Sequence, residues 1–222
     1  MIYVGYDSRE AICYDTCKLS LQYNTCNNYI VKSLNLNDLK NIYTRPNDPL
    51  ASTEFTYTRF LVPWLQDYNG WALFCDCDFV FLDDVSELFD MTDDNHAVMV
   101  CKHDYKPQNN TKMDGCQQTQ YPRKNWSSLI LWNCSHPANK KLTPDIINTQ
   151  TGKYLHRFEW LTDSEIGSIP TTWNWLVGWY KEPRDGTPKA LHYTEGGPWF
   201  DQYKDCEYAD VWNKYHEMYC SR

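Results

Sequence analysis

The sequence lacks an excess of positive charge and a long apolar run, and we expect no secretion signal. Its 21 lysine and arginine residues are outnumbered by 29 aspartate and glutamate residues, which gives a formal net charge of −8. Binding to nucleic-acid phosphates or to an anionic membrane needs a basic surface, so both are disfavoured. No apolar run approaches the roughly 18 residues of a transmembrane helix, and Met1 leads directly into a strand-like segment, 2–6, rather than a signal segment. We therefore expect no nucleic-acid partner, no integral membrane segment and a cytoplasmic location.

The ten cysteines include no Cys-x-x-Cys pair. Tetrahedral zinc sites usually contain such pairs, so zinc at Cys75 and Cys77 is a minor alternative. In a reducing compartment the thiols stay free, and we expect most of them to be buried as small apolar groups. The Asn-x-Ser/Thr triplets at Asn109, Asn125 and Asn133 then meet no glycosylation machinery.

Strand-like and helix-like segments alternate along the chain, and no internal repeat or low-complexity linker interrupts them. This order predicts one α/β domain with a mostly parallel sheet. Asp7 and Glu10 are spaced as a capping box at the start of the first helix. The expected strands are 2–6, 30–34, 72–77, 97–101, 128–131 and 189–193. The expected helical segments are 7–23, 53–65, 85–89 and one that begins or ends at 163–166. We also expect a C-terminal helix that packs its aromatic face on the body of the protein; this face consists of Tyr208, Trp212, Tyr215 and Tyr219.

The most informative segment is the apolar run from Trp71 to Cys75, which continues into Asp76-Cys77-Asp78. Side chains alternate between the faces of a strand, so the two carboxylates point the same way and the cysteines point into packing. Two carboxylates at the end of a buried strand are costly to desolvate unless a cation binds them. Hard oxygen ligands suit Mg²⁺ or Mn²⁺, often together with substrate phosphates. The alternative is a pair of solvated aspartates in a turn.

Ligands of open α/β sheets bind beyond the carboxyl ends of the strands. Asp7, the Asp76/Asp78 pair and His192 all follow or end predicted strands, so we expect them at one edge. A neutral imidazole can be a third ligand for Mn²⁺, although a lone histidine is as readily a structural hydrogen-bonding group. The glycines that follow His192, Gly196 and Gly197, would let the backbone approach a ligand closely.

The order of these segments resembles that of GT-A fold glycosyltransferases, in particular glycosyltransferase family 8, the group of glycogenin and the lipopolysaccharide galactosyltransferases. The resemblance extends from about Ile2 to Phe200 and rests on YTRFLVPWL, FCDCDFVFLDDVSELF, SSLILWN, a D-x-E segment and HYTEGGPW. It implies a Rossmann-like mixed sheet flanked by helices in a single domain, 1–222. About 1–100 would form the nucleotide and metal half, about 101–200 the acceptor-side half and 201–222 the C-terminal helix.

The resemblance also implies an activity. Members of this family use Mn²⁺, or Mg²⁺, and move a hexose from a nucleotide-diphosphate sugar to a glycan or other hydroxyl acceptor with retention of anomeric configuration. UDP-glucose and UDP-galactose are the favoured donors. Same-face attack is the favoured route to retention, because no residue stands out as a nucleophile.

Roles for individual residues follow from the same resemblance. Asp76, Asp78 and His192 would hold the metal that bridges the donor diphosphate. Arg59 would lie near the donor sugar, or else on a helix surface. The acidic residues Asp163 and Glu165 would be catalytic, because a carboxylate beside the anomeric carbon stabilises an oxocarbenium-like centre. The remaining donor-binding positions are Tyr6 and Asp7, at the base and ribose, and Cys77, Gly196 and Gly197.

Two departures from the family pattern stand out. A lysine that usually precedes Pro-Trp and reaches the diphosphate is replaced by Gly197, in a turn one residue shorter. Lys102, Arg123 or Lys124 could replace it, as could the N–H groups of the two glycines. Ser164 stands where the acidic motif often has glutamine.

Other features leave alternatives open. The polar segment 102–126 is long enough for an acceptor-side loop or a surface excursion. Trp173 and Trp175 could stack on a sugar, although we expect at least one of them in the core. Asp76 and Asp78 would be nucleophile and acid/base in a haloacid-dehalogenase-like phosphatase, a motif that usually opens its chain. A third alternative is a non-catalytic nucleotide-sugar-binding module.

Overall fold

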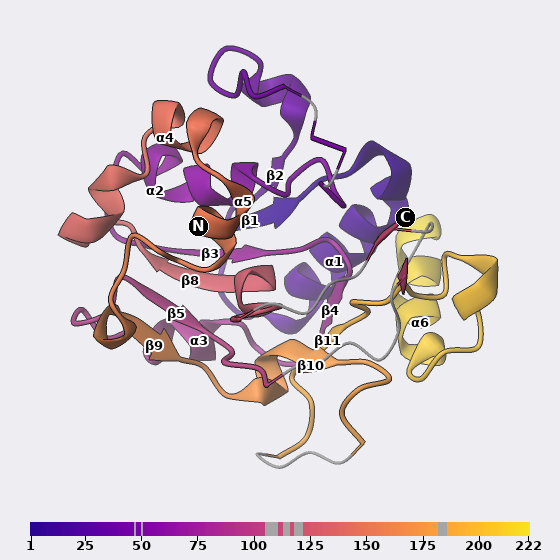
Figure 1. Cartoon of the computed structure of the whole chain (residues 1–222). Coiled ribbons are helices and arrows are strands. Elements are labelled where there is room, and N and C mark those ends of the chain that lie inside the picture. Colours follow the sequence, from indigo (N-terminus) through magenta and orange to yellow (C-terminus); the bar gives the residue numbers. More distant parts are fainter. Residues whose placement is uncertain (47, 50, 105–110, 113–115, 118–121, 182–185) are drawn as a thin grey trace.

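A six-stranded mixed sheet forms the centre of the molecule in this computed structural model (Figure 1). The structure describes residues 1–222 except 47, 50, 105–110, 113–115, 118–121 and 182–185. The strand order is β2-β1-β3-β8-β5-β9. Neighbouring strands pair in parallel except at β8, which runs antiparallel to both β3 and β5. The strands are β1 (Ile2–Gly5), β2 (Val31–Leu34), β3 (Trp71–Cys75), β5 (Val98–Val100), β8 (Leu129–Asn133) and β9 (Ile166–Ser168).

A second, three-stranded sheet of order β10-β11-β4 adjoins the first. It consists of β10 (Trp175–Leu176), β11 (Ala190–His192) and β4 (Phe79–Phe81), and a separate two-stranded pair joins β6 (Thr111–Lys112) to β7 (Cys116–Gln117). Only the turn 76–78 separates β3 from β4, so the chain passes from one sheet into the other through the acidic motif. The predicted strand 72–77 therefore ends at Cys75, and the two aspartates lie in a turn.

The helices are mostly short and surround the sheets (Figure 1). The segment 53–65 contains less helix than predicted, because Thr53 and Thr56 bond to each other through backbone and hydroxyl groups at 3.1 Å and so compete with a helical turn. The helices are α1 (Ala11–Asn24), α2 (Val62–Leu65), α3 (Ser86–Asp90), α4 (Pro144–Thr149), α5 (Gly152–His156) and α6 (Ala209–Cys220), and shorter 3-10 turns include Ser8–Glu10, Thr58–Leu61, Asp163–Glu165 and Thr171–Asn174.

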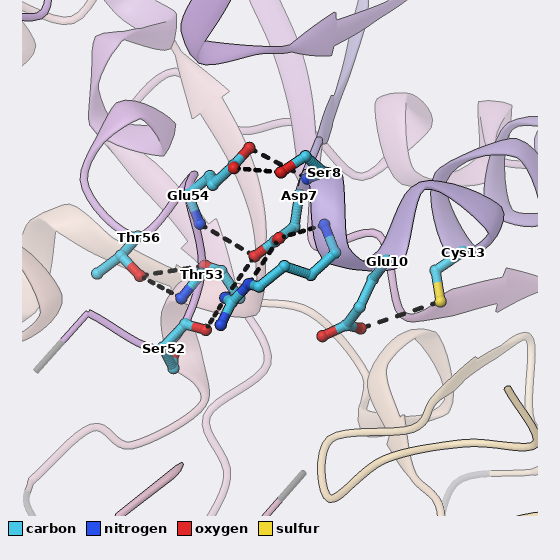
Figure 2. Close-up of polar contacts among 9 residues, drawn as sticks. Asp7, Ser8, Glu10, Cys13, Ser52, Thr53, Glu54 and Thr56 are labelled. Carbon is cyan, nitrogen blue, oxygen red and sulfur yellow. Dashed lines mark hydrogen bonds and ion pairs between the residues drawn. The ribbon is translucent and has the colours of Figure 1, made fainter. Parts of the chain in front are cut away.

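The predicted capping box at the first helix is wrong. The Asp7 side chain accepts a hydrogen bond from the backbone N–H of Arg9, at 2.9 Å, and starts a 3-10 turn rather than α1. Glu10 makes no capping bond to the backbone of the helix it precedes. Its carboxylate turns away from Asp7 and towards Cys13 (Figure 2).

Two apolar clusters form the core, and the second packs the C-terminal helix α6 against the smaller sheet. Trp212 and Tyr215 of α6 are buried with Val80, Trp175 and Leu191 of the smaller sheet. This confirms the predicted packing of the aromatic face, although its outer members differ: Tyr208 is the left-handed N-cap residue of α6, and Tyr219 is 41% exposed.

Other predictions about packing are also tested. Trp173 and Trp175 are both buried, as core residues. The cysteines whose side chains are described are free; six are buried, Cys206 is half-buried, and Cys26 and Cys220 are exposed. None of the helices in the described part of the chain is long and apolar enough to cross a membrane.

Candidate metal and donor site

Asp76, Asp78 and His192 converge where the two sheets meet. One ligand atom from each lies within 4.8 Å of the others, and the three residues form the single such group among the described histidines, cysteines and acidic residues. The backbone sets this geometry. The N–H of Asp76 bonds to the carbonyl of Ser128, and the carbonyl of Asp78 accepts from Tyr193, so the turn is fixed to β8 on one side and β11 on the other.

His192 is held from three directions. Its ring stacks on Phe79, its partner in the antiparallel β11–β4 pair, with centroids 4.4 Å apart. Its Nε2 atom lies 3.4 Å from Oδ2 of Asp78, and its Nδ1 atom lies 2.8 Å from Oδ1 of Asn174. Asn174 is fully buried and its sequence context gave no sign of this contact. Burial lowers the pKa of the neighbouring His103 to about 3, and that ring stays neutral.

Arg59 pairs with the first aspartate of the motif. Its Nη1 atom lies 2.7 Å from Oδ1 of Asp76, and the same atom donates to the carbonyl of Ser127 at 2.8 Å. The guanidinium also lies over the rings of Phe55 and Phe74. Arg59 is buried, so it is not a helix-surface arginine. It places a fixed positive charge beside the carboxylates.

These side chains line a pocket of about 40 Å³, and one further residue of its wall was not predicted to belong to the site. Glu10 is 5% exposed and lines the same pocket as Asp76 and Asp78. The sequence pattern predicted that Glu10 caps the first helix, so its position in the pocket wall was not predicted. The other residues of the wall are Ser52, Thr53, Phe55, Arg59, Cys77, Asn125, His192 and Thr194.

Asp7 is bound to Glu54, which follows the pocket residues Ser52 and Thr53, and its carboxylate is engaged by neighbours. It accepts from Nε and Nη2 of Arg9, at 3.0 and 2.7 Å, and from the N–H of Glu54 at 3.2 Å. Burial alone would raise the pKa of Asp7, but these bonds outweigh it and lower the pKa. The Glu54 carboxylate in turn accepts from the hydroxyl and N–H of Ser8 (Figure 2). The turn after β1 is thus tied to segment 52–56. Tyr6, just before it, packs edge-on against Tyr14.

The glycine turn after β11 is shaped by aromatic packing. A Cβ atom at Gly196, whose φ is +125°, would lie 2.6 Å from the Tyr203 ring, and one at Gly197 would lie 2.0 Å from the Trp199 ring. The N–H of Gly196 donates to the carbonyl of Tyr193, so it is not free to bind phosphate. Cys77 lines the pocket, but burial raises the pKa of its thiol well above the ordinary value.

The structure does not bring Asp163 and Glu165 to this pocket. Glu165 is level with Ala97 at the start of β5, whereas Asp76 follows the far end of β3. The strands β3 and β9 are three spacings apart, which is about 14 Å across the sheet. Asp163 is exposed and pairs with Arg123, and Glu165 caps its own turn by accepting from Thr162, which lowers its pKa.

Two of the cationic side chains considered as replacements for the missing lysine bind groups that do not line this pocket. Lys102 donates to the carbonyl of Ile166, and Arg123 donates to the carbonyl of Arg157 as well as pairing with Asp163. Lys124 is buried. Most of the predicted acceptor-side loop, 102–126, lies outside the described residues, as does Asn109.

The donor set fits a divalent metal. Two carboxylates and one imidazole, drawn from both predicted halves of the chain, meet within bonding reach of one ion, and their oxygen-rich chemistry suits Mn²⁺ or Mg²⁺. A thiolate zinc site is not supported, because Cys75 and Cys77 are buried and their pKa values are raised well above normal by that burial.

The fold is shared with solved glycosyltransferases, although no family model matches the sequence. The bifunctional glycosyltransferase WbbM superposes with a TM-score of 0.65 and 16% identity over 97% of this chain, which spans 49% of WbbM. The glycosyltransferase GlyE of Streptococcus pneumoniae superposes with a TM-score of 0.62 and 14% identity. The match covers 97% of this chain and 59% of GlyE. The galactosyltransferase LgtC, solved with donor and acceptor sugar analogues, superposes with a TM-score of 0.60 and 13% identity. The match covers 98% of this chain and 95% of LgtC. These identities show a common fold alone, and it is the predicted GT-A fold.

A much closer match comes from sequence. Protein CDI of Arabidopsis thaliana is 53% identical over 223 residues, which cover 98% of this chain and 86% of that relative. Similarity at this level over nearly the whole length places both chains in one family. The chain belongs to the family of Protein CDI.

Proposed function

We propose that this protein is a metal-dependent glycosyltransferase that uses a nucleotide-diphosphate sugar, with the retaining chemistry of glycosyltransferase family 8. The observation that carries the proposal is the convergence of Asp76, Asp78 and His192 at the junction of the sheets in a GT-A fold. A divalent ion held there would supply Lewis-acid charge to the leaving diphosphate. Mn²⁺ is the favoured ion, and UDP-glucose or UDP-galactose the favoured donor.

Arg59 is the cation that we assign to the donor in place of the missing lysine. It lines the pocket and is held beside Asp76 by a charge-assisted contact. A lysine at position 197 would need space that Trp199 fills. Arg59 therefore balances part of the charge of three pocket carboxylates, from Glu10, Asp76 and Asp78, and orients the diphosphate.

The pocket of about 40 Å³ has room for an ion and its first ligands but not for a nucleotide. A groove of about 670 Å³ adjoins it, and Thr53 lines both. We place the nucleoside in this groove, which Arg9, Tyr43 and Tyr57 also line. Asp7 then acts at the nucleoside indirectly, by fixing the Arg9 guanidinium.

Glu10 takes the acidic role that the resemblance gave to Asp163 and Glu165. Its buried carboxylate lines the pocket beside the expected diphosphate, where negative charge stabilises an oxocarbenium-like sugar. Same-face attack by the acceptor hydroxyl stays the proposed route to retention. The acceptor class, a glycan or another hydroxyl compound, is proposed from the family chemistry.

A thermal-shift matrix tests the metal and the nucleotide together. Mn²⁺ with UDP should raise the melting temperature by more than the sum of the separate shifts, because an ion held by Asp76, Asp78 and His192 would add its charge to the binding of the diphosphate. Asp78→Asn should abolish the extra shift, and Asp94→Asn, outside the pocket, should keep it. No shift with UDP, GDP, CDP or ADP would refute the proposal. A panel of nucleotide sugars, scored by release of nucleoside diphosphate, then identifies base and sugar.

The two alternatives give different results in the same assays. A haloacid-dehalogenase-like phosphatase would hydrolyse a generic phosphomonoester, and Asp76→Asn would abolish that turnover. The shared glycosyltransferase fold argues against it. A non-catalytic binding module would show the nucleotide shift without any donor hydrolysis over long incubation.

A further inference from the structure

A chain of buried hydrogen bonds extends from His192 to a backbone carbonyl. Nδ1 of His192 lies 2.8 Å from Oδ1 of Asn174, and Nδ2 of Asn174 lies 2.9 Å from Oγ of Ser128. The Ser128 hydroxyl lies 2.7 Å from the carbonyl oxygen of Asn125. His192, Asn174 and Ser128 are at most 3% exposed, so water does not compete for these bonds.

The direction of every bond in this chain follows from its last member. A carbonyl oxygen can only accept, so the single hydroxyl proton of Ser128 points to Asn125. Ser128 must then accept from Asn174, which turns the NH₂ group of the amide towards Ser128 and its oxygen towards His192. An amide oxygen also only accepts, so the proton of the neutral imidazole is on Nδ1.

We propose that Asn174 is a positioning residue that, with Ser128, fixes His192 in the tautomer whose Nε2 lone pair faces Asp78. The inference rests on the proposed function, because the lone pair matters only if Nε2 binds a metal beside the two carboxylates. In that arrangement Nε2 is ready to bind without losing a proton or turning over the ring. The same hydrogen bond and the stacking on Phe79 restrict rotation of the imidazole.

This device has a predictable failure. An apolar residue of similar size at position 174 gives Nδ1–H no acceptor, and the Nε2–H tautomer then gains a hydrogen bond to Asp78 instead, whose Oδ2 atom is 3.4 Å away. The proton would occupy the position that the metal needs. Loss of an outer partner of a histidine ligand typically weakens metal binding by about 10- to 100-fold.

The tautomer can be measured without metal or activity. In metal-free protein with ¹⁵N-labelled histidine, long-range ¹H–¹⁵N spectra should show His192 as Nδ1–H, the signal being assigned with His192→Gln. Asn174→Leu should convert it to Nε2–H and weaken Mn²⁺ binding about 10- to 100-fold, measured by the loss of free-ion paramagnetic resonance signal. Asn174→Asp keeps an acceptor for Nδ1–H and should restore the tautomer.

Asn139 provides the matched control. It is also fully buried, and its amide bonds to the carbonyls of Ala97 and Asn133. Asn139→Leu should therefore cost stability without changing the tautomer or the Mn²⁺ affinity. If Asn174→Leu does not fold, Ser128→Ala takes its place, because the freed amide can turn over and should give a mixture of tautomers.

Two results would overturn the inference: Nε2–H in the unmodified protein, or an unchanged tautomer and affinity in Asn174→Leu. Wild-type protein that binds no Mn²⁺ while showing Nδ1–H would refute the metal proposal and leave the tautomer assignment standing.

Discussion

Removal of the Arg59 guanidinium should destabilise the protein and increase its response to Mn²⁺. The Arg59–Asp76 contact of 2.7 Å joins side chains that are only 6% and 15% exposed. Breaking a buried ion pair by removing one partner costs about 3–5 kcal/mol. The partial exposure of Asp76 favours the lower end, so Arg59→Met should lower the free energy of unfolding by about 3 kcal/mol, or roughly 6–12 °C in melting temperature for a chain of this size.

The metal should compensate for this loss. Without Arg59, Asp76 loses the positive charge that lies 2.7 Å from its carboxylate, and a divalent cation at the carboxylates gains more than it does in the wild type. Urea denaturation with and without millimolar Mn²⁺ measures both effects. Arg45→Met is the matched control. Like Arg59, Arg45 lies over an aromatic ring, that of Tyr57, and it donates to two carbonyls, but it pairs with none of the site carboxylates.

A double-mutant cycle of Arg59→Met with Asp76→Asn completes the test. Residues in direct contact usually couple by about 0.5–3 kcal/mol, so the double variant should be less destabilised than the sum of the single ones. Additive effects, or an equal gain from Mn²⁺ in the Arg59 and Arg45 variants, would refute this reasoning.

Three further predictions concern other residues. Burial and a hydrogen bond to Asp48 raise the pKa of Tyr57 to about 12, so the contribution of Tyr57 to stability is constant below pH ~10 and is lost between about pH 10 and 12. Tyr57→Phe should remove this loss of stability, measured by urea titrations across that pH range. Identical alkaline stability profiles in the variant and the wild type would contradict the prediction. Glu10→Gln should slow donor hydrolysis about 10-fold or more with little loss of stability, and an unchanged rate would exclude Glu10 from the reaction. Gly197→Ala should lower the free energy of unfolding by about 1–3 kcal/mol because its Cβ displaces Trp199, and a neutral melting temperature would show that the ring moves freely.

The sequence predicted the parts of the site that local pattern determines. Asp76 and Asp78 follow an apolar strand, and His192 ends another, so the rule for strand ends was enough to bring them together. The residue at which β3 ends was not predictable from local pattern. It depends on the hydrogen bond from the N–H of Asp76 to the carbonyl of Ser128, which is far from Asp76 in the sequence.

The missed residues depend on tertiary contacts. Glu10 satisfied a capping pattern, but the hydrogen bonds of Asp7 to Arg9 and Glu54 replaced that cap and left Glu10 to line the pocket. Asn174 lies between Trp173 and Trp175, and nothing in that sequence context predicts its contact with His192. The acidic pair at 163–165 matched a family pattern, and a 3-10 turn at the start of β9 places it at the end of the sheet opposite to Asp76.

The position of β8 has a consequence for how the chain is made. It lies between β3 and β5, and both of these strands precede it in sequence. During synthesis, β3 and β5 therefore emerge before the strand that joins them, and the sheet cannot close until residues 129–133 leave the ribosome. Until then, β3 presents an unpaired apolar edge, the kind of surface that invites wrong pairing. The two predicted halves, about 1–100 and about 101–200, thus meet in one sheet, and the joining of β3 to β5 waits for β8.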